Sequence, residues 1–292
     1  MGPHRAAEPI IEGCLRICGY ATIAMVVLII AFILKEGIPL FRDYPLTGFL
    51  FGRSWQPLSA TRPAFGILPL LAGSALITLA GTALAVPVAI AAACYIAEVA
   101  PQGSRDLLKS GVELLSGVPS IVFGFLGMLI VVPLVKELFG LASGLTALAG
   151  AVVLAVMALP LIVTVAEDAL RAQPQSYREA SLALGASRWD TIVRVLLPAA
   201  RSGLTAAMML GVGRILGETM AVMMVTGNAG IIPGSLLVPA RALTATIAAE
   251  MGETVHYSDH YRALFAIGAV LLVLSLGVNW AAAGLRERGK PR

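Results

Sequence analysis

The sequence predicts an all-α membrane protein with six transmembrane helices, and three observations support this fold class. Of its 292 residues, 58% are hydrophobic and only 13% are charged, and the mean hydropathy is +0.87. A water-soluble chain of this length cannot bury so much apolar surface. Six uncharged apolar stretches each reach the length of a spanning helix, roughly 18 residues. We therefore expect a single transmembrane domain over 1–292, without a soluble domain.

The six predicted spans follow these uncharged stretches. They are Ile17–Leu34, Gly66–Ala97, Leu114–Val135, Leu138–Ala166, a fifth span, and Ala263–Leu285. The fifth span can be placed at Ser202–Thr226 or at Thr219–Ala240. Gly227-Asn228 and Pro233-Gly234 are turn residues, so the chain should leave the membrane there. This favours Ser202–Thr226 as the fifth span.

The first span and the loop after it carry three further expectations. The span is expected to be an uncleaved anchor, because Leu34-Lys35-Glu36 at its end is not a small-residue cleavage site. The three cysteines of the chain imply no disulfide framework. Aromatic residues of the loop 35–65 would suit the headgroup level, so this loop is expected to lie on the membrane surface.

The third and fifth predicted spans each contain residues that disturb a regular apolar helix. In the third, Val118-Pro119-Ser120 follows a glycine and predicts a kink or an interruption. Such a break serves helix packing or lines a cavity, and both interpretations are open. In the fifth, Arg214 and Glu218 would lie near the middle of the membrane, where each costs roughly 2.5–3.5 kcal/mol on insertion scales.

Arg214 and Glu218 are spaced i, i+4, so one continuous helix would place them on the same face, where they can form an ion pair. A buried pair of this kind can serve only to fix helix packing. In the functional interpretation, a cation beside a transport pathway attracts an anion, and the nearby carboxylate prevents a permanent trap. We predict Arg214 and Glu218 as substrate-pathway residues.

Basic residues indicate how the chain is oriented. The segments 1–16, 98–111, 167–201 and 285–292 hold 13 Lys and Arg residues, against 7 in 35–65, 136–143 and 227–262. Basic residues concentrate on the cytoplasmic side of membrane proteins. We therefore predict that both termini and the segment 167–201 are cytoplasmic. The pI of about 9.1 follows from these inner residues, and no nucleic-acid partner is expected.

The cytoplasmic segment 167–201 has the features of two short helices joined by a turn. Ser176-x-x-Glu179 and Ser187-x-x-Asp190 both have the form of a capping box. Gly185 lies between them and permits a left-handed backbone and the close approach of another protein. Taken alone, these features also fit an ordinary loop between helices.

The same segment resembles the cytoplasmic EAA signature of ABC-transporter permease subunits. That signature reads Glu-Ala-Ala, three residues, Gly, nine residues, Ile, one residue, Leu-Pro. The matching residues here are Glu179, Ala180, Ser181, Gly185, Val195, Leu197 and Pro198, with Ser181 at an alanine position and Val195 at the isoleucine position. The resemblance implies that Glu179–Pro198 forms a pair of coupling helices, between the fourth and fifth spans, that contacts an ATPase.

The region around Arg214 resembles the PstC-type permease of the phosphate-specific ABC importer. The matching residues are Gly211, Gly213, Arg214, Gly217, Glu218, Thr219, Met220, Ala221 and Val222. Further matches are Val118-Pro119-Ser120, Thr246-Ile247-Ala248-Ala249-Glu250 and His260-Tyr261. The resemblance covers nearly the whole chain. It implies the fold of a type I ABC importer permease, with the permease core at 67–285.

The resemblance also implies a function and a set of partners. The chain would be a multi-pass subunit that passes inorganic phosphate across the cytoplasmic (inner) membrane. A PstA-type permease subunit, a dimer of ATP-binding subunits and a periplasmic or lipid-anchored phosphate-binding protein would complete the importer. ATP and Mg would bind to the partner ATPase, while this chain would bind no cofactor and catalyse no reaction. Arg214 and Glu218 would correspond to the charged pair of the phosphate pathway.

Several residues and motifs also allow other interpretations of the function. Arg214 alone does not exclude another oxyanion, such as sulfate or molybdate. A stand-alone channel or secondary transporter would show inverted repeats, which are not evident, and would need no docking segment. Gly284-x-x-x-x-Gly289-Lys290-Pro291 lacks the Ser or Thr of a nucleotide-binding loop. His256-x-x-x-His260 has zinc-like spacing, but an interfacial role explains it better, and no metal site is predicted.

Overall fold

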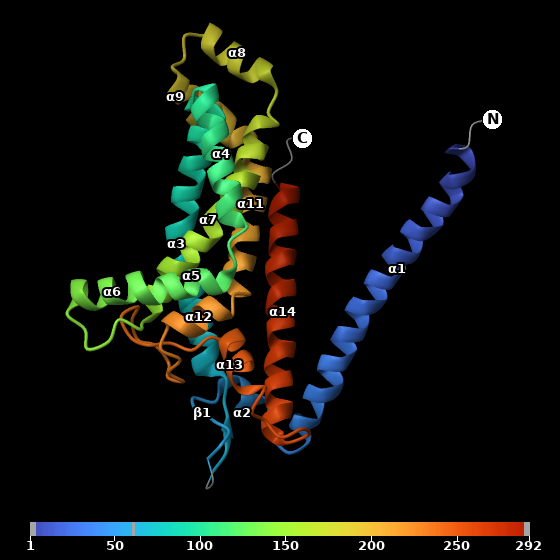
Figure 1. The fold of residues 1–292 in the computed structure, drawn as a ribbon, viewed down its shortest axis with the longest axis vertical. Coiled ribbons are helices and arrows are strands. Elements are labelled where there is room, and N and C mark those ends of the chain that lie inside the picture. The colour runs from blue at the N-terminus through green and yellow to red at the C-terminus, as the bar shows by residue number, and fades with distance from the viewer. Residues whose placement is uncertain (1–3, 60–61, 289–292) are drawn as a thin grey trace.

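The computed structural model describes residues 4–59 and 62–288, and most of these are helical. In Figure 1, the helices α3, α7, α11 and α14 run along the long axis of the molecule, and α5, α6 and α12 cross it. The helices α8 and α9 lie at one end, and α2, β1 and α13 lie at the other. The first turns of α1 and the last turns of α14 lie at the α8 end.

The helices and strands have the following bounds. The α-helices are α1 His4–Gly37, α2 Leu46–Phe51, α3 Leu68–Cys94, α4 Gln102–Ser116, α5 Ser120–Leu126, α6 Val132–Phe139, α7 Ala147–Arg171, α8 Gln175–Ala183, α9 Arg188–Thr191, α10 Leu197–Ala199, α11 Arg201–Leu216, α12 Met220–Val225, α13 Leu243–Glu250 and α14 Asp259–Arg288. The 3₁₀-helix η1 is Ile38–Arg42, and the π-helical turns are η2 Tyr95–Val99, η3 Gly127–Val131 and η4 Ile192–Leu196. The strands β1 Trp55–Gln56 and β2 Ala64–Phe65 pair antiparallel.

The lengths and compositions of the described helices agree with six spans. Five of them are long and apolar enough to cross a membrane: Glu12–Arg42, Leu68–Val99, Ser120–Phe139, Ala147–Arg171 and Asp259–Ala281. The pair Arg188–Ala199 and Arg201–Leu216 adds a sixth if it is counted as one span, with a bend of 75° between its two parts. The all-α, six-span prediction is therefore confirmed.

The predicted bounds of the third and fourth spans need correction. The expected break at Val118-Pro119 is real: α4 ends at Ser116 and α5 begins at Ser120, so the third span starts six residues later than the predicted Leu114. The fourth span starts at Ala147 rather than Leu138. Gly140 ends α6 with a left-handed backbone (φ +61°), and the hydroxyl of Thr146 accepts a hydrogen bond from the amide of Ala149 to begin α7.

The fifth span is not the continuous helix that Ser202–Thr226 predicts. The helix α11 ends at Leu216, and α12 begins only at Met220. As Figure 1 shows, α12 then crosses the direction of α11. The predicted turn at Gly227-Asn228 is confirmed, because both residues have positive φ values, +78° and +48°.

The inner core is built around α3 and α7. Every fourth residue of α3 from Ile77 to Ala93 is buried, and all but the first are glycine or alanine: Ile77, Gly81, Ala85, Ala89 and Ala93. These residues pack along α7, and α11 packs against both helices. Small residues allow helix backbones to approach closely, which is the main source of helix association in lipid.

Several aromatic residues of the loop 35–65 belong to a second apolar core. Phe49, Trp55 and Phe65 are buried, and they pack with Leu243 of α13 and Leu264 of α14. The paired strands β1 and β2 place Trp55 opposite Phe65. These aromatic rings therefore pack against α13 and α14, a contact that the sequence did not reveal, and the position of the loop at the membrane surface stays a prediction.

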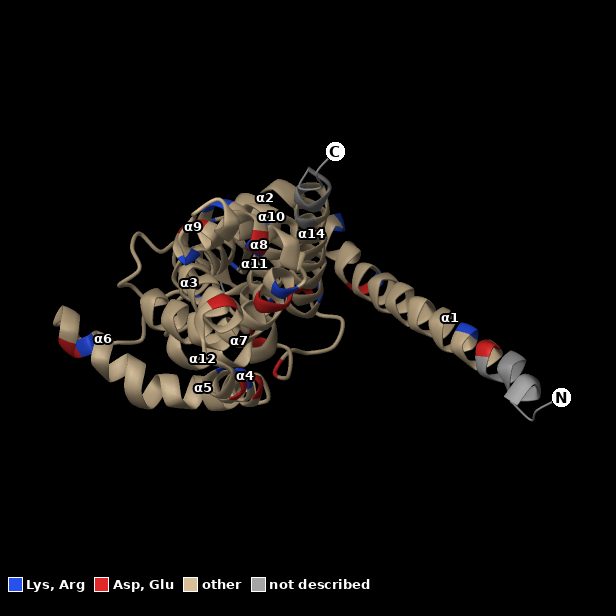
Figure 2. Cartoon of the chain, turned by 90° about the horizontal axis from the view of Figure 1, so that it is seen from above, with Lys and Arg blue, Asp and Glu red and all other residues tan. Residues whose placement is uncertain are grey.

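Charged side chains are unevenly distributed over the fold. Figure 2 shows them around α4, α8 and α9, whereas most of α1, α5 and α12 is free of them. The helix α1 contacts α14 near the end of the molecule that carries α2 and α13, where Phe32 lies edge-on to Phe265 with ring centroids 5.5 Å apart. Over the rest of its length α1 diverges from α14 (Figure 1).

Gly73 tests the close packing of the helical core. An added Cβ there would overlap the carbonyl oxygen of Arg241, which is backbone and cannot rotate away. Gly73→Ala is expected to destabilise the protein by about 1–3 kcal/mol, the usual cost of overpacking. Gly111→Ala in α4 is the matched control, since its added Cβ has no neighbour within 4 Å. Thermal unfolding of both variants in detergent tests this, and an equal unfolding temperature for the two would contradict it.

Candidate functional site

The segment between α7 and α11 folds as the predicted pair of short helices, α8 and α9, which we call the coupling pair after its predicted role. The helix α8 ends at Ala183, and Gly185 follows with φ +84°, a left-handed conformation that glycine adopts without strain. The helix α9 then begins after Ser187 and continues through η4 into α10. The predicted turn at Gly185 is confirmed, and the region around this glycine is open, with no atom within 4 Å of an added Cβ.

One of the two predicted capping boxes is present. The Ser187 hydroxyl accepts a hydrogen bond from the amide of Asp190 at 3.1 Å and donates one to the Asp190 carboxylate at 2.5 Å. The predicted box at Ser176 and Glu179 is wrong, because α8 begins one residue earlier, at Gln175, with Pro174 at the cap position.

Ser181 connects the two short helices. Its side chain is buried, and its hydroxyl forms a hydrogen bond of 2.9 Å with the hydroxyl of Thr191 in α9. This bond explains how a serine fits an alanine position of the signature, since the added oxygen has a partner. Glu179 and Ala180, next to it in α8, are both exposed.

The outer surface of this pair presents apolar side chains to solvent. Leu184 is 89% exposed and Trp189 is 70% exposed, and Tyr177 and Leu182 are about half exposed. These four residues, which we call the apolar tip, come from α8, the turn at Gly185 and α9, and Leu182 also lines the hollow described next. A large exposed apolar group of this kind marks a site of contact with another protein or with the membrane.

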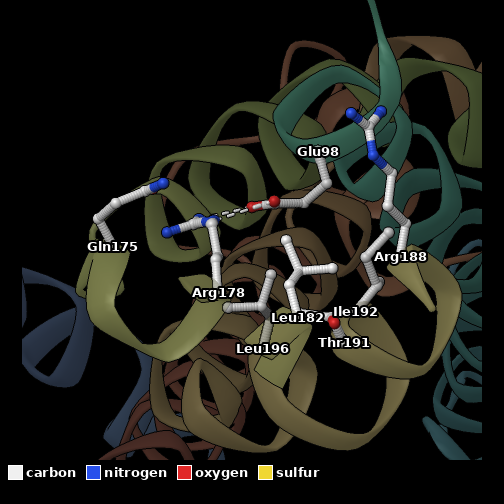
Figure 3. Close-up of a pocket in the computed structure, with 8 residues that line it drawn as sticks. All are labelled: Glu98, Gln175, Arg178, Leu182, Arg188, Thr191, Ile192 and Leu196. Atoms are coloured by element: carbon white, nitrogen blue, oxygen red, sulfur yellow. Dashed lines mark hydrogen bonds and ion pairs between the residues drawn. The ribbon is translucent and has the colours of Figure 1, made fainter. Parts of the chain in front are cut away.

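The inner side of α8 is held by a buried ion pair. Figure 3 shows Arg178 and Glu98 pointing toward each other. Both line a hollow of about 180 Å³, whose other lining residues are Gln175, Leu182, Arg188, Thr191, Ile192 and Leu196. The Arg178 Nη2 and Nε atoms donate to the two carboxylate oxygens of Glu98 at 2.6 and 3.0 Å. These bonds raise the pKa of Arg178 above its ordinary value.

Arg178 also bonds to the carboxyl end of α7. Its Nη2 donates to the carbonyl oxygen of Leu170 at 3.1 Å, and its Nη1 donates to that of Gln173 at 3.0 Å. Among the described residues, Arg178 is the one α8 side chain that bonds to α3, η2 or α7. Sequence reasoning missed this residue, although it directly precedes Glu179.

A second buried carboxylate joins α4 to α7. Glu167 is only 1% exposed; Lys109 Nζ lies 2.9 Å from its Oε2, and Arg171 Nε lies 2.6 Å from its Oε1. The hydrogen bond to Glu167 raises the pKa of Lys109. Sequence analysis did not identify the pair of Lys109 and Glu167 either, because these two residues lie 58 positions apart.

Leu197 and Pro198 lie where the chain turns from the coupling pair into α11. Together with Ala199 they form α10, and the chain bends by 75° between α10 and α11. Pro198 directly follows the first residue of α10, just after the π-helical turn η4, and lies near the end of the continuous helix Arg188–Ala199, where the chain bends. The Leu-Pro of the signature therefore redirects the chain from the coupling pair into the membrane-spanning part.

Arg214 faces a hollow of about 240 Å³ between four elements. Its other lining residues come from α4, α5, α7 and the break after α4: Leu115, Ser116, Val118, Phe123, Met157 and Leu161. The predicted break at Val118-Pro119 and the predicted cation therefore meet at one place. In the part of the chain that the structure describes, no ion pair or hydrogen bond joins Arg214 to another residue.

Glu218 does not pair with Arg214, and the expected i, i+4 arrangement is wrong because α11 ends before Glu218. The Glu218 side chain is 6% exposed, and its Oε1 accepts a hydrogen bond from the amide of Ala221 at 3.3 Å. Its own carbonyl oxygen accepts a 2.7 Å bond from Thr244 Oγ1. Glu218 therefore caps the start of α12, which leaves Arg214 as an uncompensated cation facing the hollow.

The histidines between α13 and α14 are arranged differently from a zinc site. His260 Nε2 lies 2.7 Å from Glu250 Oε2, and Arg241 and Trp55 also donate to the Glu250 carboxylate. His256 instead packs its ring against Tyr261. Among the described residues, no group of three or more His, Cys, Asp or Glu side chains could hold a metal ion.

Comparison with known proteins agrees with this architecture. The family model described as "binding-protein-dependent transport system inner membrane component" matches residues 85–288. The probable ABC transporter permease protein YqgH of Bacillus subtilis is 39% identical over 260 residues, which cover 88% of this chain and 84% of that protein. The phosphate transport system permease protein PstC of Mesorhizobium japonicum is 34% identical, with 78% and 74% covered. PstC 1 of Mycobacterium tuberculosis is 35% identical, with 77% and 73% covered.

A solved structure supports the fold. A chain of the MetNI methionine ABC transporter, solved in inward-facing conformations, superposes with a TM-score of 0.60 at 20% identity and covers 77% of this chain and 96% of that one. The arrangement of spans is thus that of the type I ABC importer permeases. Because the family model matches well over half of the residues, the chain belongs to the family of binding-protein-dependent transport system inner membrane components.

Proposed function

We propose that the chain is a membrane-spanning permease subunit of an ATP-driven ABC importer and that its cargo is inorganic phosphate. The observation that supports phosphate as the cargo is the position of Arg214. This cation has no carboxylate partner in the described structure and faces a hollow between α4, α5, α7 and α11. Its guanidinium suits an oxyanion, which accepts several hydrogen bonds from its fork of donors. Two relatives that are 34% and 35% identical carry the name of phosphate transport permease.

The coupling pair explains how such a subunit is driven without catalysing a reaction. The apolar tip around Gly185 would insert into an ATP-binding subunit, which would hold ATP and Mg, while this chain binds no cofactor. Closure of two ATP-binding subunits would then push α8 and α9 toward the spans. A PstA-type subunit would complete the pathway, and a phosphate-binding protein would deliver cargo at the opposite, outer end.

The hollow at Arg214 would admit the anion between the ends of two interrupted spans. Ser116 also lines this hollow and offers a hydroxyl donor. Glu218 would act indirectly, by fixing the start of α12 and the break that follows Arg214. The proposal thus assigns cargo contact to Arg214 and a positioning role to Glu218.

Phosphate uptake tests the cargo and the role of Arg214 together. In vesicles that contain the assembled importer, Arg214→Gln is expected to lower ATP-driven phosphate uptake by about tenfold or more, which corresponds to about 1.4 kcal/mol. Arg214→Lys keeps the charge but loses the planar fork, so an intermediate rate is expected. Excess sulfate should not compete in the wild type. Full uptake by Arg214→Gln would remove Arg214 from the pathway, and competition by sulfate would change the cargo.

The left-handed turn at Gly185 gives a second test. Gly185→Val is expected to reduce uptake strongly, because a left-handed conformation costs an ordinary side chain about 1–2 kcal/mol and a branched one more. Gly185→Asn is the matched control, since asparagine tolerates this conformation. Copurification of the ATP-binding subunit and uptake are measured for both variants. Equal behaviour of the two would show that the turn conformation is not what matters.

The predicted orientation can be tested with a single cysteine. In a variant without the native cysteines, Leu184→Cys should react with a membrane-impermeant maleimide in inside-out vesicles and stay unlabelled in right-side-out vesicles, because the apolar tip would be cytoplasmic. A cysteine placed at the exposed Val255 of the opposite end serves as the reversed control. Labelling of Leu184→Cys from the outside would invert the proposed topology.

A further inference from the structure

We infer that the Arg178–Glu98 ion pair is the joint through which the coupling helix α8 moves the transmembrane helices. This inference rests on the proposed importer function, but not on the identity of the cargo. Arg178 uses all three nitrogens of its guanidinium, with two bonds to Glu98 and one each to the carbonyls of Leu170 and Gln173. The side chains of Arg178 and Glu98 are mostly buried, at 17% and 10% exposed.

The location of Glu98 makes this pair more than a local contact. Glu98 lies in η2, the π-helical turn that ends the α3 span, and α3 packs along α7 through the inner core. Arg178 also binds the last turn of α7, at Leu170. One guanidinium thus holds α8 to the inner ends of both core helices. A displacement of α8 therefore reaches them through short side-chain bonds as well as through the connecting residues 172–174.

The same π-turn continues the connection toward the hollow at Arg214. Its free carbonyl oxygens at Ile96 and Ala97 accept hydrogen bonds of 2.9 Å from Arg105 of α4. The helix α4 then leads directly to Ser116, which lines the hollow, and to the break at Val118-Pro119. Arg178 and Arg105 therefore both bind η2, one at the Glu98 side chain and the other at the backbone of Ile96 and Ala97, so this turn links the coupling helix to the helix beside the proposed cargo site.

A neutral double variant separates this role from a merely structural one. Glu98→Gln or Arg178→Gln alone leaves one buried charge unpaired, which destabilises a protein whatever its function. The double variant Glu98→Gln/Arg178→Gln removes both charges and should assemble. If the pair is the joint, the assembled double variant hydrolyses ATP at the wild-type rate, but its phosphate uptake per ATP falls by about fivefold or more.

The control is a second arginine on the same segment. Arg194 of η4 lies 3.3 Å from Asp190, but its side chain is 80% exposed. Exposed pairs contribute little, so Arg194→Gln should keep the wild-type ratio of phosphate to ATP. A double variant that also keeps this ratio would overturn the inference.

Two further measurements keep the test decisive. If the double variant does not assemble, Arg178→Lys replaces it, because lysine keeps the charge but cannot reach all four acceptors from one planar group. Its ratio should fall severalfold, and a wild-type ratio would overturn the inference. If the wild-type complex hydrolyses ATP without moving phosphate, the proposed cargo fails, and the ratio is measured with the oxyanion that the complex does transport.

Discussion

The fold depends on the close approach of α3 and α7. Lipid is as apolar as the side chains it surrounds, so helices in a membrane gain little from hydrophobic burial and associate through contact between small residues. The stripe from Gly81 to Ala93 supplies such a surface on α3, and alanines on α7 face it in the inner core. This contact sets the position of the inner ends of both helices, where Glu98 and Leu170 receive the same arginine.

Features that depend on neighbours in the chain could be predicted from the sequence. Gly185 in a left-handed turn, Ser187 as a helix cap and the break before Ser120 are local, since each follows from the backbone preferences of one or two residues. Hydropathy likewise located most spans. Long-range pairs could not be predicted: Arg178 and Glu98 are 80 positions apart, and their meeting depends on the register of α3 against α7.

The charged residues of the fifth span show a different limit. Gly213-x-x-x-Gly217 fits a helix-packing motif and was compatible with one uninterrupted helix. In the structure, Gly217 follows the last turn of α11, and the buried carboxylate of Glu218 binds the amide of Ala221. Helical spacing predicts a pair only while the helix continues. Where a carboxylate can satisfy a free backbone amide inside the membrane, that local bond replaces the expected ion pair.

The position of α1 determines how much of this helix the rest of the fold depends on. Among the described residues of α1, none belongs to the buried apolar core, and the family match begins only at residue 85, in α3. The helix contacts α14 near one end and contributes no residue to the hollow at Arg214 or to the coupling pair. An N-terminal span attached in this way can be altered over most of its length without changing the packing of the helices behind it.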